Sequence, residues 1–135
     1  MSTPAEPAAA PARPSRMAVL AASLGGLAVI AGAFGAHGLK AMLSEQALAW
    51  WHTGAQYHLV HALVLLVAAT VPATRPKARA LANGALVAGI AIFSGSLYVM
   101  ALTGVTALGA VTPIGGVGLI VGWFALAFSF FPPKR

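Results

Sequence analysis

Four histidines are the residues of this chain with the widest chemical scope. They are His37, His52, His58 and His61. A neutral imidazole both donates and accepts hydrogen bonds, so these residues can in principle ligate a metal or haem, relay protons or bind a polar ligand. The only acids are Glu6 and Glu45, and cysteine is absent, so carboxylate pairs, nucleophile triads and thiolate sites lack their residues. We therefore expect no catalytic residues of the soluble type and no enzyme.

The segments that position these histidines have the composition of a membrane protein. Of 135 residues, 59% are hydrophobic and 7% are charged, with a mean hydropathy of +0.87. A soluble domain carries roughly a quarter charged residues, and here no charge falls between Ala80 and Pro133. The formal charge of +6 would alone suggest nucleic acid, but the basic residues do not form one exposed face. The composition excludes a soluble enzyme, a nucleic-acid partner and a disordered chain, and indicates a lipid bilayer.

Apolar stretches and turn signals predict an all-α, four-transmembrane-helix bundle. The expected helices cover approximately residues 17–39, 44–71, 81–102 and 113–131, within a membrane domain of residues 17–131. Ser44 is a candidate N-cap, and Thr112 is a cap candidate before Pro113. Residues 1–16 are expected to form a disordered tail, and 132–135 a short end. Ala31-Gly32-Ala33 mimics a signal-peptide cleavage site, but the apolar stretch exceeds the roughly 7–15 residues of a signal core, so we favour a retained helix.

The distribution of basic residues predicts the orientation of the chain. With four spans, every Lys and Arg except Lys40 falls at the chain ends or in the middle link. Because cytoplasmic segments are enriched in Lys and Arg, we expect an N-in, C-in topology. The tail and the C-terminal end are then cytoplasmic, and the links 40–47 and 103–112 face outward.

The four histidines differ in depth and direction. On a helix, His61 shares a face with Trp50 and Tyr57, and His58 points about 60° away. His58 and His61 lie about 12–16 Å below Trp50, near the bilayer middle, whereas His37 and His52 lie near the outer boundary. One metal site or a two-histidine haem site is therefore not expected, and we predict no metal and no cofactor. A haem or quinone site is the weakest alternative.

Histidine within the bilayer needs hydrogen-bond partners, and two roles remain open. His58 and His61 either make a buried hydrogen bond that fixes the helix register, or belong to a proton relay or polar ligand site. Their candidate partners are Gln56, Tyr57, Ser94, Ser96 and Tyr98. The full candidate intramembrane cluster is His37, His52, Tyr57, His58, His61, Ser94, Ser96, Tyr98 and Thr112. The spans hold no carboxylate or lysine, which disfavours ion-coupled transport.

Glycine recurs at close spacing in three of the expected helices. The candidate packing positions are Gly32, Gly35, Gly95, Gly115, Gly116, Gly118 and Gly122, and the last two form a G-x-x-x-G pair. Small residues let helices approach closely, which favours packing within one chain or self-association.

Several motifs in order resemble a known family. Gly32 to Gly38 reads Gly-Ala-Phe-Gly-Ala-His-Gly, and Tyr57 precedes His61-Ala62-Leu63. They are followed by Phe-Ser-Gly-Ser-Leu-Tyr at 93–98, Thr-Pro-Ile-Gly-Gly at 112–116 and Gly122-Trp123. This pattern resembles the YgdD-like small inner-membrane proteins, a domain-of-unknown-function family with a distant eukaryotic relative. The resemblance implies four spans and inner-membrane residence, without an activity or cofactor. It also implies that His37 and His61 occupy motif positions, whereas His58 stands where Gln can occur.

These observations lead to one functional expectation and one alternative. We expect a non-enzymatic accessory or scaffold protein that packs in a membrane complex or self-associates. Its partner is then another membrane protein or a second copy. The alternative is a small transporter, channel or proton-relay protein that uses the polar cluster in the outer half of the spans.

Overall fold

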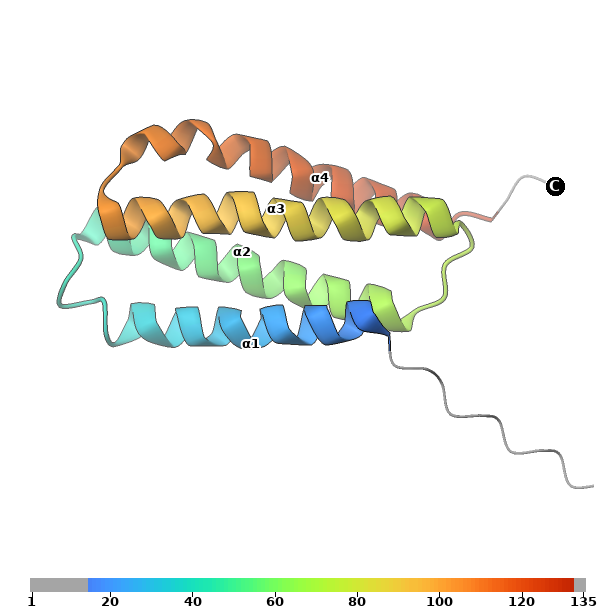
Figure 1. Cartoon of the computed structure of the whole chain (residues 1–135), viewed down its shortest axis with the longest axis horizontal. Helices are drawn as coiled ribbons and strands as arrows, with labels where there is room; N and C mark the ends of the chain where they lie inside the picture. The colour runs from blue at the N-terminus through green and yellow to red at the C-terminus, as the bar shows by residue number, and fades with distance from the viewer. Residues whose placement is uncertain (1–14, 133–135) are drawn as a thin grey trace, which may run out of the picture.

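Four long antiparallel helices make up the fold of this computed structural model, which describes residues 15–132 (Figure 1). They are α1 (Arg16–Ala36), α2 (Glu45–Thr70), α3 (Pro76–Thr103) and α4 (Thr112–Ser129), with a 3-10 helix η1 (Thr106–Ala110) before α4. All four spans, η1 counted with the last, are long and apolar enough to cross a membrane. The prediction of an all-α, four-span protein is confirmed. The expected tail lies almost entirely in residues 1–14, and most of the expected end in 133–135, outside the described residues.

The helix boundaries follow local capping chemistry. Ser44 accepts a hydrogen bond from the backbone N–H of Ala47 at 3.2 Å and caps α2, as predicted. The helix α3 begins at Pro76 rather than near residue 81, because proline suits the first turn of a helix. Thr112 is not a cap: it lies inside α4, and its Oγ1 contacts the Leu108 carbonyl oxygen at 3.3 Å instead.

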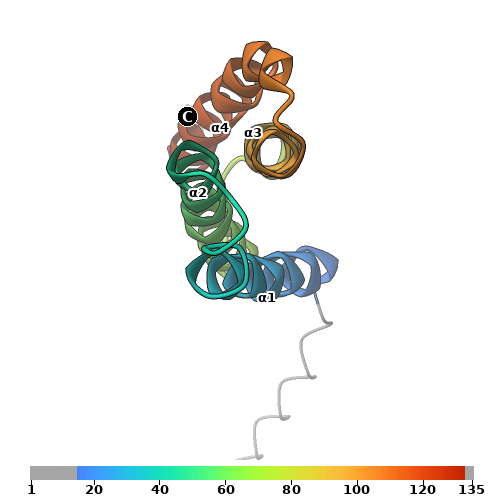
Figure 2. The same ribbon diagram turned by 90° about the vertical axis from the view of Figure 1, so that its left-hand side faces the viewer.

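The helices pack mainly on their sequence neighbours. The extensive contacts join α1 to α2, α2 to α3 and α3 to α4, so the end-on view shows an open, folded layer (Figure 2). The helix α1 lies at one edge of this layer, beside α2. Two grooves follow from this arrangement, one between α2 and α4 and one where α1 and α3 approach the same side of α2.

Glycine lets α3 and α4 make the closest helix contact. A Cβ atom added to Gly115 would collide with the backbone of Phe93, and one added to Gly122 would lie 2.6 Å from Leu86 Cγ. A Cβ on Gly118 would lie 3.4 Å from Gly89 Cα. The bilayer supplies no hydrophobic drive between helices, so this close approach is what stabilises the pair.

The other predicted packing glycines have three kinds of environment. A Cβ on Gly35 would lie 2.6 Å from Trp51 Cδ1, so Gly35 does let α1 approach α2. A Cβ on Gly116 would make only ordinary contact with the Phe93 ring, at 3.7 Å. Gly32 and Gly95 have no heavy atom within 4 Å of an added Cβ, so they pack against nothing in residues 15–132.

A buried arginine ties three helices together at one end of the molecule. This end, where α1 begins, α2 and α3 are linked and α4 ends, is called the basic end (Figure 1). Arg79 donates through Nη1 to the carbonyl oxygens of Ala68 and Val71 and through Nε to Ser129 Oγ. It thereby satisfies carbonyls at the C-terminus of α2, which have no partner within the helix, and holds α4 beside them.

Candidate functional site

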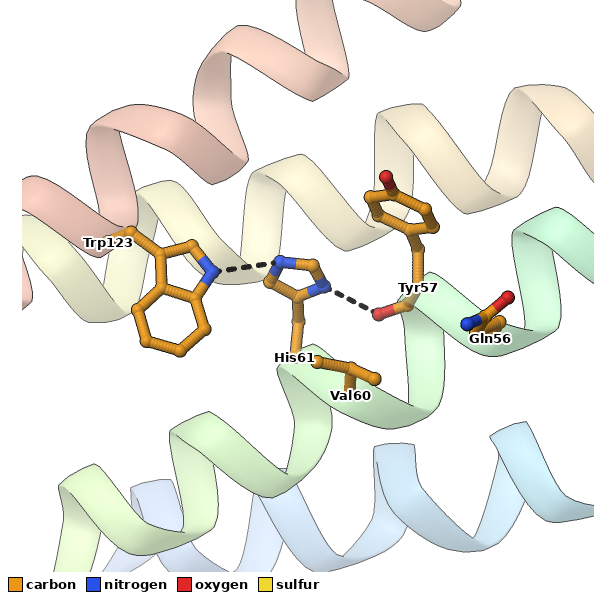
Figure 3. Close-up of a pocket in the computed structure, with 5 residues that line it drawn as sticks. All are labelled: Gln56, Tyr57, Val60, His61 and Trp123. Atoms are coloured by element: carbon orange, nitrogen blue, oxygen red, sulfur yellow. Dashed lines mark hydrogen bonds between the residues drawn. The ribbon is translucent and has the colours of Figure 1, made fainter.

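His61 of α2 is the most completely bonded of the four histidines. Its Nδ1 lies 2.6 Å from the carbonyl oxygen of Tyr57, and Trp123 Nε1 donates to its Nε2 at 3.2 Å (Figure 3). A carbonyl oxygen only accepts and an indole N–H only donates. The imidazole must therefore be the neutral tautomer with its proton on Nδ1. No hydrogen-bonding atom of the ring is left free.

The His61–Trp123 bond is a polar link between α2 and α4. Most packing of α4 is on α3, and this bond adds to the apolar core cluster that α2 and α4 share near Ala68 and Leu126. Sequence reasoning did not include Trp123 among the partners of His61. The available signal was an indole N–H placed in mid-span, because such a donor needs an acceptor inside the bilayer.

A shallow groove of about 320 Å³ surrounds this bond between α2 and α4. It is lined by Gln56, Tyr57, Val60, His61 and Trp123 (Figure 3). The rings of Tyr57 and His61 stack with centroids 5.7 Å apart, and both Tyr57 and Trp123 are exposed along one side. The groove therefore offers aromatic surface and the Gln56 amide, while the imidazole forms part of its wall without a free nitrogen.

His58, one turn earlier on α2, has a different environment. Its Nδ1 lies 3.3 Å from the Tyr98 hydroxyl of α3, whereas its Nε2 is buried without a partner. The hydroxyl of Ser94, also on α3, is likewise buried and unpartnered. Tyr98 also packs on Trp51, with ring centroids 4.6 Å apart. His58, Ser94 and Tyr98 all line the second groove, which lies between α1 and α3.

The remaining predicted polar residues lie elsewhere. His37 is the exposed C-cap of α1, and His52 is exposed on α2 with its ring near Gly35. Ser96 and Thr112 share a hydrogen bond of 2.8 Å between α3 and α4. The nine candidate residues therefore do not form one cluster. They form four separate groups: one around His61, one around His58, the two outer histidines, and the Ser96–Thr112 pair. Within residues 15–132, no three histidine or acidic side chains are grouped to hold a metal ion.

These observations define a class of protein: a small multi-pass membrane protein whose deep polar side chains bond across helices. The family model described as "Protein of unknown function (DUF423)" matches residues 31–116. The chain belongs to this family, which confirms the resemblance drawn from its motifs.

Similar proteins occur in distant bacteria. The chain is 44% identical over 99 residues to the UPF0382 membrane protein YwdK of Bacillus subtilis, covering 72% of this chain and 80% of the relative. It is 37% identical over 102 residues to a UPF0382 membrane protein of Haemophilus influenzae, covering 76% and 82%. No solved structure matches the chain.

Proposed function

We propose that this protein is a non-enzymatic accessory or scaffold protein of the bacterial inner membrane. In this proposal α1 packs against a transmembrane helix of a larger complex or of a second copy. The observation that carries the proposal is the position of α1 at the edge of the fold. Only 11% of the most apolar 18-residue stretch of α1 is buried, compared with 44% of the corresponding stretch of α3.

The glycines of α1 favour a protein partner over lipid alone. An added Cβ at Gly25, Gly26 or Gly32 would meet no heavy atom within 4 Å. Glycine in a helix interior costs about 1 kcal/mol relative to alanine, and against fluid lipid it brings no compensating contact. A second helix would regain that cost because small residues allow close approach and packing.

Photo-crosslinking in native membranes tests this proposal. With a photoreactive residue in place of Gly26, we expect one discrete crosslinked product, to another membrane protein or to a second copy. The change Gly32→Leu should abolish that product. The matched control places the photoreactive residue at Gly84, which is equally open but lies on α3. Crosslinks to lipid alone at Gly26, with a monomer in mild detergent, would contradict the proposal.

The non-enzymatic part of the proposal is supported by the bonding of His61. His61 is one of two candidates for proton transfer in the deep part of α2, and both its ring nitrogens are engaged, by Tyr57 and Trp123. A relay would first have to break the bond from Trp123.

An N-in, C-in orientation is part of the same proposal. Arg16, Arg75, Lys77 and Arg79 all lie at the basic end, which supports placing that end in the cytoplasm. A C-terminal fusion to a reporter that is active only outside the cytoplasm should give no signal. Reporter activity at that position would refute the orientation.

A further inference from the structure

The outward-facing side of α2 carries a polar amide in the middle of the span. Gln56 is exposed, and it lies about 17 Å along the helix from the first residue of α2 and about 21 Å from the last. A hydrocarbon core about 30 Å thick therefore lies beside it. The Gln56 amide forms no hydrogen bond with the other residues that line its groove (Figure 3).

An amide in contact with lipid tails is costly. Acyl chains neither donate nor accept hydrogen bonds, so they satisfy neither the carbonyl oxygen nor the NH2 group of Gln56. The hydroxyls of Ser23 and Thr53, which are also exposed on the spans, each donate at 2.9 Å to the carbonyl oxygen four residues earlier. Gln56 makes no bond of this kind within residues 15–132, which indicates a polar partner outside the fold of one chain.

Gln56 also lies in the middle of an exposed stripe along α2. The residues of this α2 stripe recur at alternating intervals of four and three: Ala49, Thr53, Gln56, Val60, Leu63 and Val67. This spacing suits a seam that packs on a second helix, and the stripe is about 27 Å long, close to the thickness of the hydrocarbon core. In the end-on view α3 lies on one side of α2, and the opposite side of α2 is uncovered (Figure 2).

The chemistry of the stripe favours a second copy of the same chain. Copies of one chain share one orientation in the membrane, so two facing α2 helices run parallel and place their Gln56 residues at equal depth. A carboxamide has both a donor and an acceptor, so two facing amides can form two reciprocal hydrogen bonds across a two-fold axis. A single polar residue in such a seam also fixes the register of the two helices.

We propose that the protein forms a homodimer through the α2 stripe, in which the two Gln56 amides pair across the two-fold axis. The exposed side of α4 contrasts with this stripe, because Val117, Ile120 and Phe124 are apolar and suit lipid. The stripe does not include α1, so the dimer is compatible with a further partner at α1 and does not rest on the role proposed for that helix.

Disulfide crosslinking in native membranes tests this interface, because the chain has no cysteine of its own. The change Val60→Cys places one thiol on the stripe, one turn from Gln56. Oxidation with copper phenanthroline should then give a product of twice the mass of the chain. A disulfide needs Cβ atoms about 4 Å apart, so a cysteine on the seam reacts far more readily than one facing lipid.

Two matched controls place the cysteine on other helices. Ile120→Cys on α4 and Leu27→Cys on α1 replace exposed residues, as Val60→Cys does. All three positions lie about 14–17 Å along their helices from the basic end. Ile120→Cys should give little product, whereas Leu27→Cys reports separately on self-association through α1.

Variants of Gln56 test the amide pair itself. In the Val60→Cys chain, Gln56→Leu should reduce the crosslinked fraction, and Gln56→Asn, which keeps an amide, should reduce it less. Gln46→Leu makes the same change at an exposed position in the first turn of α2 and should have no effect. Energy transfer between labelled full chains in liposomes, diluted with lipid, should show that Gln56→Leu weakens association roughly tenfold. Circular dichroism confirms that each variant is helical.

Four results would overturn the proposal. Crosslinking of Val60→Cys that is no greater than that of Ile120→Cys would mean that the stripe faces lipid. A product of any other mass would mean that a different protein covers it. Equal association of the wild-type and Gln56→Leu chains would mean that the amides do not pair. A dimer formed through Leu27→Cys but not through Val60→Cys would contradict this interface and still support the role proposed for α1.

Discussion

His58 and His61 lie one turn apart on the same helix, yet their surroundings are of opposite kinds. Both are buried, and both lie in the deep part of α2. His61 uses both ring nitrogens, one with Tyr57 and one with Trp123. His58 uses one nitrogen with Tyr98 and leaves the other unsatisfied. Depth in the membrane therefore does not decide whether a histidine has a structural role. The two histidines differ in whether both ring nitrogens have hydrogen-bond partners.

The open packing of the four helices explains this difference. His61 faces the seam between α2 and α4, where an indole donor comes from the neighbouring helix. His58 faces α3 beside the groove that α1 leaves open. A closed bundle would surround both histidines with side chains. In this fold His61 links α2 to α4, whereas His58 lines the groove between α1 and α3.

Replacing His61 should give the largest loss of stability. The change His61→Leu keeps a similar volume but leaves the Trp123 N–H without an acceptor. We expect the free energy of unfolding to fall by about 1–3 kcal/mol. Unfolding in mixed detergent–SDS micelles, followed by circular dichroism, measures this value. His52→Leu is the control on the same helix, because His52 is exposed. Equal effects of the two changes would remove the structural role assigned to His61.

Replacing Trp123 should have a smaller effect that depends on His61. The change Trp123→Phe should lower the free energy of unfolding by about 0.5–1.5 kcal/mol, since one hydrogen bond is lost. In the double variant that also carries His61→Leu, the total loss of stability should be smaller than the sum of the two single losses, because both changes remove the same bond. Strict additivity in this double-mutant cycle would show that the bond contributes nothing.

The elements of the fold were predictable from the sequence, but the partners of the histidines were not. Apolar length, proline and capping signals are local, so they predicted four spans and the Ser44 cap. Helix periodicity places His58 and His61 on faces of α2 but does not say which helix covers each face. For that reason Trp123 was missed, and Ser94 was included among the candidate partners of the histidines although its hydroxyl has no hydrogen-bond partner.

The role of Arg79 at the basic end also could not be predicted from the sequence. Its charge was interpreted as a signal of orientation in the middle link. In the structure Arg79 is buried in α3 and bonded to the ends of α2 and α4. That role depends on where two other helices end in space, which no local pattern records.

Removing the Ser94 hydroxyl should affect stability in the opposite direction from replacing His61. The change Ser94→Ala deletes a buried hydroxyl that has no hydrogen-bond partner. We expect the free energy of unfolding to stay unchanged or rise by up to about 1 kcal/mol. The micelle unfolding assay used for His61 measures this change, and Ser96→Ala, which loses the bond to Thr112, is the control expected to be destabilised. A clear loss of stability for Ser94→Ala would mean that its hydroxyl has a structural partner, and His58 would then no longer contrast with His61.

The smallest effect is expected at Tyr57, and it tests which atom of that residue supports His61. His61 bonds to the Tyr57 backbone carbonyl, which every residue at this position provides. Tyr57 is 43% exposed, so its ring already lies partly outside the protein core. The change Tyr57→Phe removes the hydroxyl and keeps the ring that stacks on His61, so the free energy of unfolding should change by less than about 0.5 kcal/mol. The Nδ1–H tautomer of His61, measured by nitrogen NMR chemical shifts, should also persist. A shift to the other tautomer would show that the hydroxyl, and not the carbonyl, determines the state of His61.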